Sequence, residues 1–351
     1  MRGLPAGVAP AAVAAGGAHT VVLLESGEVW SCGINDWGQL GHSAGEGHVA
    51  QPRRVAGLPS DVCAVAAGHF STFAVTRSGE LWAFGRNREA QLGLGDGAAS
   101  RVGSPARVAL DDAVVDVAAG PRHSLAVTRA GTLYSWGVRA LLGLGAERWR
   151  LRLSSNEAVP CVVRALRGVR VVAAAAGGAH SAVADEDGRV YTFGEGAFSQ
   201  LGTGSTAAAA EPVLVAGVAS AAQLACGGLH TLVATHDSSV FAWGANEHGG
   251  LGLGDVDGPQ LRTPSRIPGV ALARVSAGWK HSSGVSADGK LFAWGWGGTA
   301  GESEQSSGGQ LGFDSECDFW SPVQVPLEEG VRALQVSCGF NHTAGIFAAD
   351  T

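Results

Sequence analysis

Ala15-Gly16-Gly17-Ala18-His19-Thr20 is the stretch that decides the fold, because the chain repeats it. In each copy a small residue and a glycine are followed, after two variable residues, by His and then Ser or Thr. Five further copies lie at 119–124, 176–181, 226–231, 277–282 and 338–343, and a weaker copy at 67–72 has Ser71 where the His belongs. The lead glycines, from Gly16 to Gly339, are 50 to 61 residues apart. A period near 50 with short strands is typical of a propeller or solenoid.

The first repeat shows what each unit contains. Its sequence predicts four strands, at 12–15, 19–24, 28–32 and 51–55, with turns at Gly16-Gly17 and Ser26-Gly27. The third strand carries aromatic residues in most repeats, and Gly-Gln-Leu-Gly follows it at 38–41 and again at 309–312. No segment shows a long 3.6-residue apolar period, so the chain is predicted to be nearly all β.

The repeats predict one domain over residues 1–351, because a closed ring of repeats forms a single unit. The expected repeats are 8–60, 61–112, 113–169, 170–219, 220–270, 271–330 and a partial one at 331–351. The last contains only two predicted strands. We therefore expect an incomplete seventh blade with an unpaired edge, which would invite pairing with another chain. The alternative is that the sequence is a truncated form.

The paired motifs, Gly-x-x-His-Ser/Thr and Gly-Gln-Leu-Gly, resemble those of the regulator of chromosome condensation repeat family over nearly the whole chain. The resemblance implies an all-β, seven-bladed β-propeller. It also implies two activities found in the family: guanine-nucleotide exchange on a Ran-type small GTPase, and ultraviolet-B sensing in a plant branch. The second is associated with Gly-Trp-Arg-His-Thr in three consecutive repeats. This chain matches once, at 278–282, with Gly228 and Phe340 at the neighbouring Trp positions.

The repeated histidine is expected to be structural, because a catalytic residue is rarely needed six times. We expect it to donate a hydrogen bond to a neighbouring backbone carbonyl. The six residues are His19, His123, His180, His230, His281 and His342.

The two variable residues after each lead glycine should share one face of the ring, where a propeller can vary without harming its framework. Four neighbouring repeats carry aromatic or basic groups there, which are common anchors of binding surfaces. The predicted partner-binding residues are His69, Phe70, Arg122, Trp279, Lys280, Phe340 and Asn341. A loop in the third repeat adds Arg148, Trp149, Arg150 and Arg152 as candidates for an acidic partner. The alternative is that these are ordinary turn and loop residues.

Composition narrows the function classes. The net charge of −7 disfavours general nucleic-acid binding. Six scattered cysteines without a Cys-x-x-Cys pair indicate free thiols in a reducing compartment, so cytosol or nucleus is expected, with an organelle left open. No stretch is apolar enough to span a membrane, and no metal, cofactor or catalytic signature stands out. The sequence thus predicts a non-enzymatic protein-interaction scaffold, with nucleotide exchange on a small GTPase as the alternative and ultraviolet-B reception after it.

Overall fold

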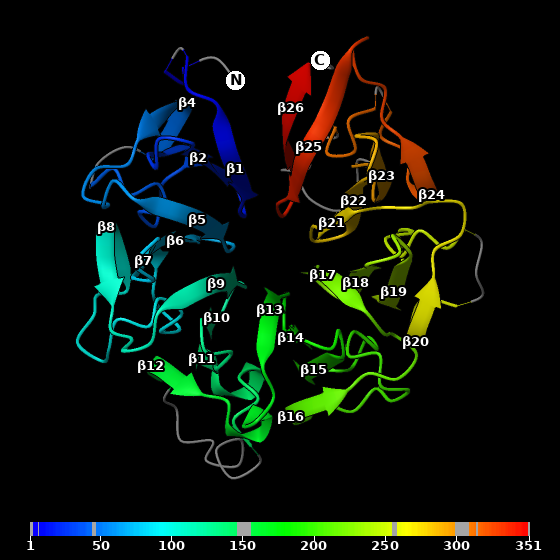
Figure 1. Ribbon diagram of the computed structural model, residues 1–351, viewed down its shortest axis with the longest axis horizontal. Helices are drawn as coiled ribbons and strands as arrows, with labels where there is room; N and C mark the ends of the chain where they lie inside the picture. The colour runs from blue at the N-terminus through cyan, green and yellow to red at the C-terminus, as the bar shows by residue number, and fades with distance from the viewer. Residues whose placement is uncertain are drawn as a thin grey trace.

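The computed structural model describes residues 3–5, 7–43, 47–145, 156–254, 258–298, 309–313 and 315–349. Its strands form antiparallel sheets that lie as sectors around one central axis (Figure 1). Six sheets have four strands and one has two, which gives 26 strands among the described residues. The all-β propeller is confirmed. The seventh position holds only a two-stranded sheet, so the ring has six complete blades and a partial one.

Each complete blade follows the chain from the inner strand to the outer one. The first three blades consist of β1 (Pro10–Ala15), β2 (His19–Leu24), β3 (Val29–Ile34) and β4 (His48–Arg54); β5 (Val62–Ala67), β6 (Ser71–Thr76), β7 (Leu81–Arg86) and β8 (Arg101–Val108); and β9 (Val114–Ala119), β10 (His123–Thr128), β11 (Leu133–Gly137) and β12 (Glu157–Val162).

The next three consist of β13 (Val171–Ala176), β14 (His180–Asp185), β15 (Val190–Gly194) and β16 (Ala209–Leu214); β17 (Ala221–Cys226), β18 (His230–Thr235), β19 (Val240–Ala245) and β20 (Gln260–Arg266); and β21 (Arg274–Ala277), β22 (His281–Val285), β23 (Leu291–Gly295) and β24 (Phe319–Gln324). The partial blade has β25 (Val331–Cys338) and β26 (Thr343–Ala349), and two single-turn 3-10 helices, η1 (Arg139–Leu141) and η2 (Arg164–Leu166), lie in connections.

The core lies between neighbouring blades, and the Gly-Gln-Leu-Gly segment shows why. In blade two this segment reads Ala90-Gln91-Leu92-Gly93. Gly93 has φ +72°, and a Cβ there would lie 2.8 Å from Trp136 Nε1 of blade three. That indole donates a hydrogen bond of 2.8 Å to Gln91 O in the same segment. Trp136 is fully buried. In blades two to six the buried aromatic residue of the third strand packs in this way against a glycine of the preceding blade.

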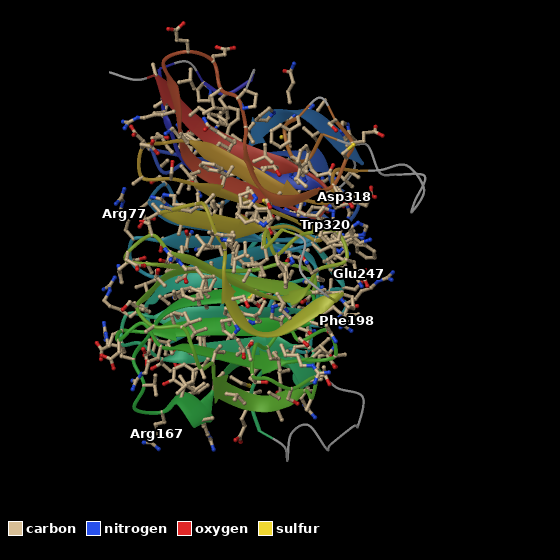
Figure 2. The ribbon with its side chains drawn as sticks, turned by 90° about the vertical axis from the view of Figure 1, so that its right-hand side faces the viewer. Arg77, Arg167, Phe198, Glu247, Asp318 and Trp320 are labelled. Atoms are coloured by element: carbon tan, nitrogen blue, oxygen red, sulfur yellow. The ribbon has the colours of Figure 1, made fainter. Side chains whose placement is uncertain are left out.

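The ring has two faces. The loop face carries the lead-glycine turns and the loops between third and fourth strands, and the turn face carries the hairpins between second and third strands and the connections between blades. Figure 2 shows Phe198, Glu247, Asp318 and Trp320 along the loop face and Arg77 and Arg167 along the turn face.

Side chains close the ring between the partial blade and blade one. Gln335 of β25 accepts a hydrogen bond from Val13 N at 3.1 Å and donates one to Val13 O at 3.2 Å. Ser337 Oγ accepts from Ala15 N at 3.0 Å. In Figure 1 β26 lies between β1 and β25, at the place where the two ends of the chain meet. Within the described residues, β26 pairs with β25 alone, as the two-strand count had predicted.

Candidate protein-binding surface

Each buried histidine of the framework reaches a hydroxyl in the next blade. His19 Nε2 lies 3.0 Å from Thr72 Oγ1, which donates at 2.7 Å to Gln39 O. The hydroxyl has one hydrogen and gives it to the carbonyl, so it accepts from the imidazole N–H, and the network places the proton on Nε2. The equivalent pairs, at 2.8 to 3.1 Å, are His123 with Ser181, His180 with Thr231, His230 with Ser282, His281 with Thr343 and His342 with Thr20.

A hydroxyl of the next blade thus stands between the imidazole and the backbone carbonyl, where the sequence had led us to expect a direct bond to the carbonyl. Burial lowers the pKa of His19, His123, His180 and His281 to about 3 and that of His230 to about 4. Burial also lowers the pKa of His342. Near neutral pH these imidazoles are uncharged hydrogen-bond donors between the blades.

The relay is interrupted in blade two. Ser71 replaces the histidine there and is 1% exposed. Its Oγ has no hydrogen-bond partner among the described residues. The receiving hydroxyl of blade three is still present, since Ser124 Oγ donates at 2.8 Å to Gln91 O. Blade two therefore lacks the imidazole donor, while blade three keeps the hydroxyl that would accept its hydrogen bond.

The lead-glycine turns meet at a central channel of about 320 Å³, lined mostly by Ala, Gly and Val of the first strands. At its loop-face end three rings stack. Phe340 lies 4.5 Å from Trp279 on one side and 4.7 Å from His69 on the other, measured between ring centroids. Burial, followed by the nearby Arg86, lowers the pKa of His69 to about 4. The stack is therefore neutral near pH 7.

Bare glycines in other repeats make room for these rings. A Cβ at Gly228 would lie 2.8 Å from Trp279 Cδ2 and 2.5 Å from Trp279 O. A Cβ at Gly17 would lie 2.0 Å from His69 Cδ2. The repeats that look empty in the sequence thus form the floor under the aromatic side chains of their neighbours.

The stack continues outward along the loop face. His69 stacks on Phe70 at 4.0 Å, and the Arg86 guanidinium lies 6.0 Å from the Phe70 ring and 5.4 Å from the Trp37 ring. The Arg88 guanidinium also lies over the Trp37 ring, 4.4 Å from its centroid. Such cation–π contacts contribute about 0.5–1 kcal/mol each at exposed sites. We call the connected set the loop-face strip: Trp279, Phe340, His69, Phe70, Arg86, Trp37 and Arg88.

Sequence reasoning missed Trp37, Arg86 and Arg88. Trp37 and Arg88 lie between the third strand and the Gln-Leu-Gly segment of their repeats, and Arg86 is the last residue of β7, so all three belong to a stretch that differs between repeats. A comparison of the residues that follow the third strand in each repeat would have found them. Arg86 is also held by Glu89, whose Oε1 lies 2.6 Å from Nη2.

Three of the predicted face residues lie outside the strip. Lys280 turns away from Trp279: its Nζ lies 3.1 Å from His248 Nε2, while His248 Nδ1 lies 2.9 Å from Asp318 Oδ2. Arg122 is exposed beside the channel, and Asn341 is half-buried in the last turn. The predicted loop residues Arg148, Trp149, Arg150 and Arg152 lie outside the described residues.

The described residues also bear on whether the chain could hold a metal ion, form disulfides or span a membrane with a helix. Among the described residues no group of three His, Cys, Asp or Glu could hold a metal ion. All six cysteines are free. No helix in the described part of the chain has the length and apolarity needed to cross a membrane.

Comparison with known proteins agrees with this architecture. The chain is 31% identical over 341 residues to the ultraviolet-B receptor UVR8 of Arabidopsis thaliana, covering 95% of this chain and 74% of the receptor. It is 29% identical over 362 residues to the secretion-regulating guanine nucleotide exchange factor of Bos taurus, covering 95% and 75%. The crystal structure of human WBSCR16 superposes with a TM-score of 0.83 at 26% identity, covering 99% of this chain and 88% of that one. The family model described as the RCC1-like domain matches residues 3–345, so the chain belongs to the RCC1-like propeller family that its repeats had indicated.

Proposed function

We propose that the chain is a regulatory protein-interaction scaffold and that it binds its partner through the loop-face strip. The observation that carries this is the connected run of aromatic rings and guanidinium groups, contributed by four different blades at the channel mouth. Rigid aromatic residues and arginines dominate the energy of protein interfaces. A scaffold needs no catalytic group, and the strip supplies none.

The strip is suited to a protein more than to a small molecule. Its floor is backbone and glycine, and its outer end at Trp37 and Arg88 lies on an open surface; Arg88 is exposed and Trp37 is half-buried. Small-molecule sites are usually concave and enclose most of the ligand. The partner we infer is a protein with carboxylate and apolar side chains that complement this surface. The free cysteines fit a reducing compartment, so we propose cytosol or nucleus as its location.

The test is affinity capture of partners from a lysate of the source organism, with the proteins identified by mass spectrometry. The test variant is Trp37→Ala with Arg88→Glu, and the matched control is Arg77→Glu, an exposed arginine on the turn face (Figure 2). We expect specific partners to be lost with the double variant and kept with the control. Equal capture by both would remove the strip as the binding surface.

A second candidate function is guanine-nucleotide exchange on a Ran-type small GTPase, which is favoured by the similarity to a named exchange factor along nearly the whole chain. Exchange factors act by binding the empty GTPase better than the loaded one. The same capture is therefore run with and without EDTA, which strips Mg²⁺ and nucleotide. A GTPase enriched only with EDTA would favour exchange over a general scaffold.

Ultraviolet-B reception is the third candidate, and the similarity to UVR8 is what raises it. Here the stacked neighbours at the channel mouth are Trp279, Phe340 and His69, so a single tryptophan takes part in the stack. A coupled set of tryptophans is absent from it. We expect ultraviolet-B irradiation to leave the sedimentation coefficient of the purified protein unchanged.

A further inference from the structure

The connections between blades on the turn face differ in charge. In blades two and six they carry acidic pairs, Asp111-Asp112 and Glu328-Glu329. In blade three, residues 163–170 read Val-Arg-Ala-Leu-Arg-Gly-Val-Arg, with arginines at 164, 167 and 170. The connections at 55–61, 215–220 and 267–273 have no Arg or Lys. In a repeat protein, such a local departure is where function is to be sought.

These arginines line a groove of about 1220 Å³ formed by blade three and the connection that follows it. The single turn η2 (Arg164–Leu166) turns the chain so that Val163 and Leu166 are buried under it. Leu133 and Val162 also line the groove, and Val162 is 40% exposed. The groove thus has an apolar floor with three cationic side chains around it.

Two of the cations have no internal counter-ion. Arg164 and Arg167 are exposed and form no ion pair with any residue that the structure describes. Arg170 is partly engaged: its Nε lies 3.6 Å from Glu186 Oε2, and its Nη2 donates at 3.1 Å to Arg129 O. Figure 2 shows Arg167 at the edge of the turn face, directed away from the body of the molecule. On a chain with a net charge of −7, this is a local positive site.

We propose that this groove binds an acidic peptide segment of a partner protein, in which a large apolar side chain stands between carboxylates. The guanidinium groups of Arg164 and Arg167 would pair with the carboxylates, since their planar donors match a carboxylate in two parallel hydrogen bonds. The apolar side chain would cover Val162, which is 40% exposed, and remove its surface from water.

Charge and floor together favour a peptide over a nucleic acid. Nucleic-acid sites depend on many phosphate contacts, and a negative net charge opposes them. Three arginines in one groove match a short acidic segment, and the apolar floor has a counterpart in a Leu or Phe side chain. The groove lies on the face opposite the loop-face strip, so it is a second site that does not depend on the proposed function.

The test uses a fluorescein-labelled peptide, Glu-Asp-Leu-Phe-Asp-Glu, and fluorescence anisotropy with the full chain at low salt. We expect saturable binding that is weakened at least about tenfold in the Arg164→Glu/Arg167→Glu variant, as is usual when interface anchors are lost. The matched control is Arg77→Glu on the same face, which should bind like the wild type. Circular dichroism establishes that each variant is folded.

Several results would overturn the inference. One is no binding up to about 1 mM peptide, a concentration that corresponds to about −4 kcal/mol. A second is equal binding by the Arg164→Glu/Arg167→Glu variant. A third is equal binding of Glu-Asp-Ser-Ser-Asp-Glu, which would remove the role of the apolar floor. A fourth is tighter binding of a ten-nucleotide oligo-dT. The Trp37→Ala variant should keep full peptide binding, which separates this test from that of the loop-face strip.

Discussion

His342 Nε2 lies 3.1 Å from Thr20 Oγ1, although the two residues are 322 positions apart in the chain. The same donor and acceptor types join blades elsewhere in the ring, so the partial blade is attached to blade one by the ordinary joint of the repeat. Its two strands are therefore held in the ring position of a full blade. Gln335 adds two further hydrogen bonds at this seam.

Removal of the acceptor at this seam should weaken it locally. Thr20→Val keeps the shape of the side chain but leaves the imidazole donor without its partner, at a cost of about 1–3 kcal/mol. We expect a lower urea midpoint and faster amide hydrogen exchange in β25 and β26. Thr231→Val, which breaks the same bond between blades four and five, is the control: it should lower the midpoint without exposing β26. Identical exchange patterns in the two variants would contradict this account of the seam.

The buried histidines should make the protein sensitive to acid. Their pKa values in the folded state are about 3 to 4, against an ordinary histidine pKa of 6.5. Because the folded pKa is lowered, the unfolded chain takes up protons first, and stability is complete above pH 6.5 and falls as the pH drops from there towards 3. At pH 5 each such histidine costs about 2 kcal/mol.

Five histidines acting together should unfold the protein between about pH 6 and pH 4. Urea titrations at a series of pH values measure the effect as the number of protons taken up on unfolding. His180→Gln should reduce that number by about one near pH 5. A free energy of unfolding that does not change between pH 7 and pH 5 would show that these side chains are protonated in the folded state.

Ser71→His should restore the missing donor of the relay. A Cβ at Gly68 would lie 2.6 Å from Ser71 Oγ, and in the other repeats the equivalent glycine faces the imidazole in the same way. With Ser124 already in place as acceptor, we expect a gain of about 1 kcal/mol, read as a higher melting temperature. Ser71→Ala, which adds no donor, is the comparison. A lower melting temperature for Ser71→His would mean that blade two leaves no room for the imidazole that the other repeats hold at this position.

Gly228→Ala should displace the stacked tryptophan. The added methyl group would lie 2.5 Å from Trp279 O, which requires the turn to move. Such overpacking costs about 1–3 kcal/mol, and the fluorescence of Trp279 should shift as the ring leaves Phe340. Gly97→Ala is a suitable control because nothing lies within 4 Å of the added atom. An unchanged emission spectrum in Gly228→Ala would contradict the contact.

The repeats made most of the fold predictable. The second strand of the first repeat was predicted at 19–24 and is found as β2 (His19–Leu24), while the outer strand predicted at 51–55 begins earlier, as β4 (His48–Arg54). The second strands are fixed by a continuous buried pattern. The outer strand is half-exposed, so its sequence marks its ends less clearly.

The loop-face strip, which we propose as the binding surface, was predictable only in part. Phe70, Trp279 and Phe340 follow lead glycines, and ring symmetry brings such residues to one end of the channel. Lys280 follows Trp279 directly but belongs to a different cluster, because successive side chains in a turn point in different directions. The contact of Arg86 with Trp37 depends on the path of two loops from neighbouring blades, which no pattern within one repeat specifies.

The direction of the histidine relay also bears on how such a chain can arise. Each repeat gives an imidazole donor to the blade that follows and offers a hydroxyl to the blade that precedes it, so the joint is head-to-tail. A single ancestral unit would therefore already contain both the imidazole donor and the hydroxyl acceptor of the joint. Tandem duplication of its gene segment would produce a matched contact at once, without a compensating substitution in either copy. Ser71 shows that the ring still forms when one copy lacks the donor half of its joint.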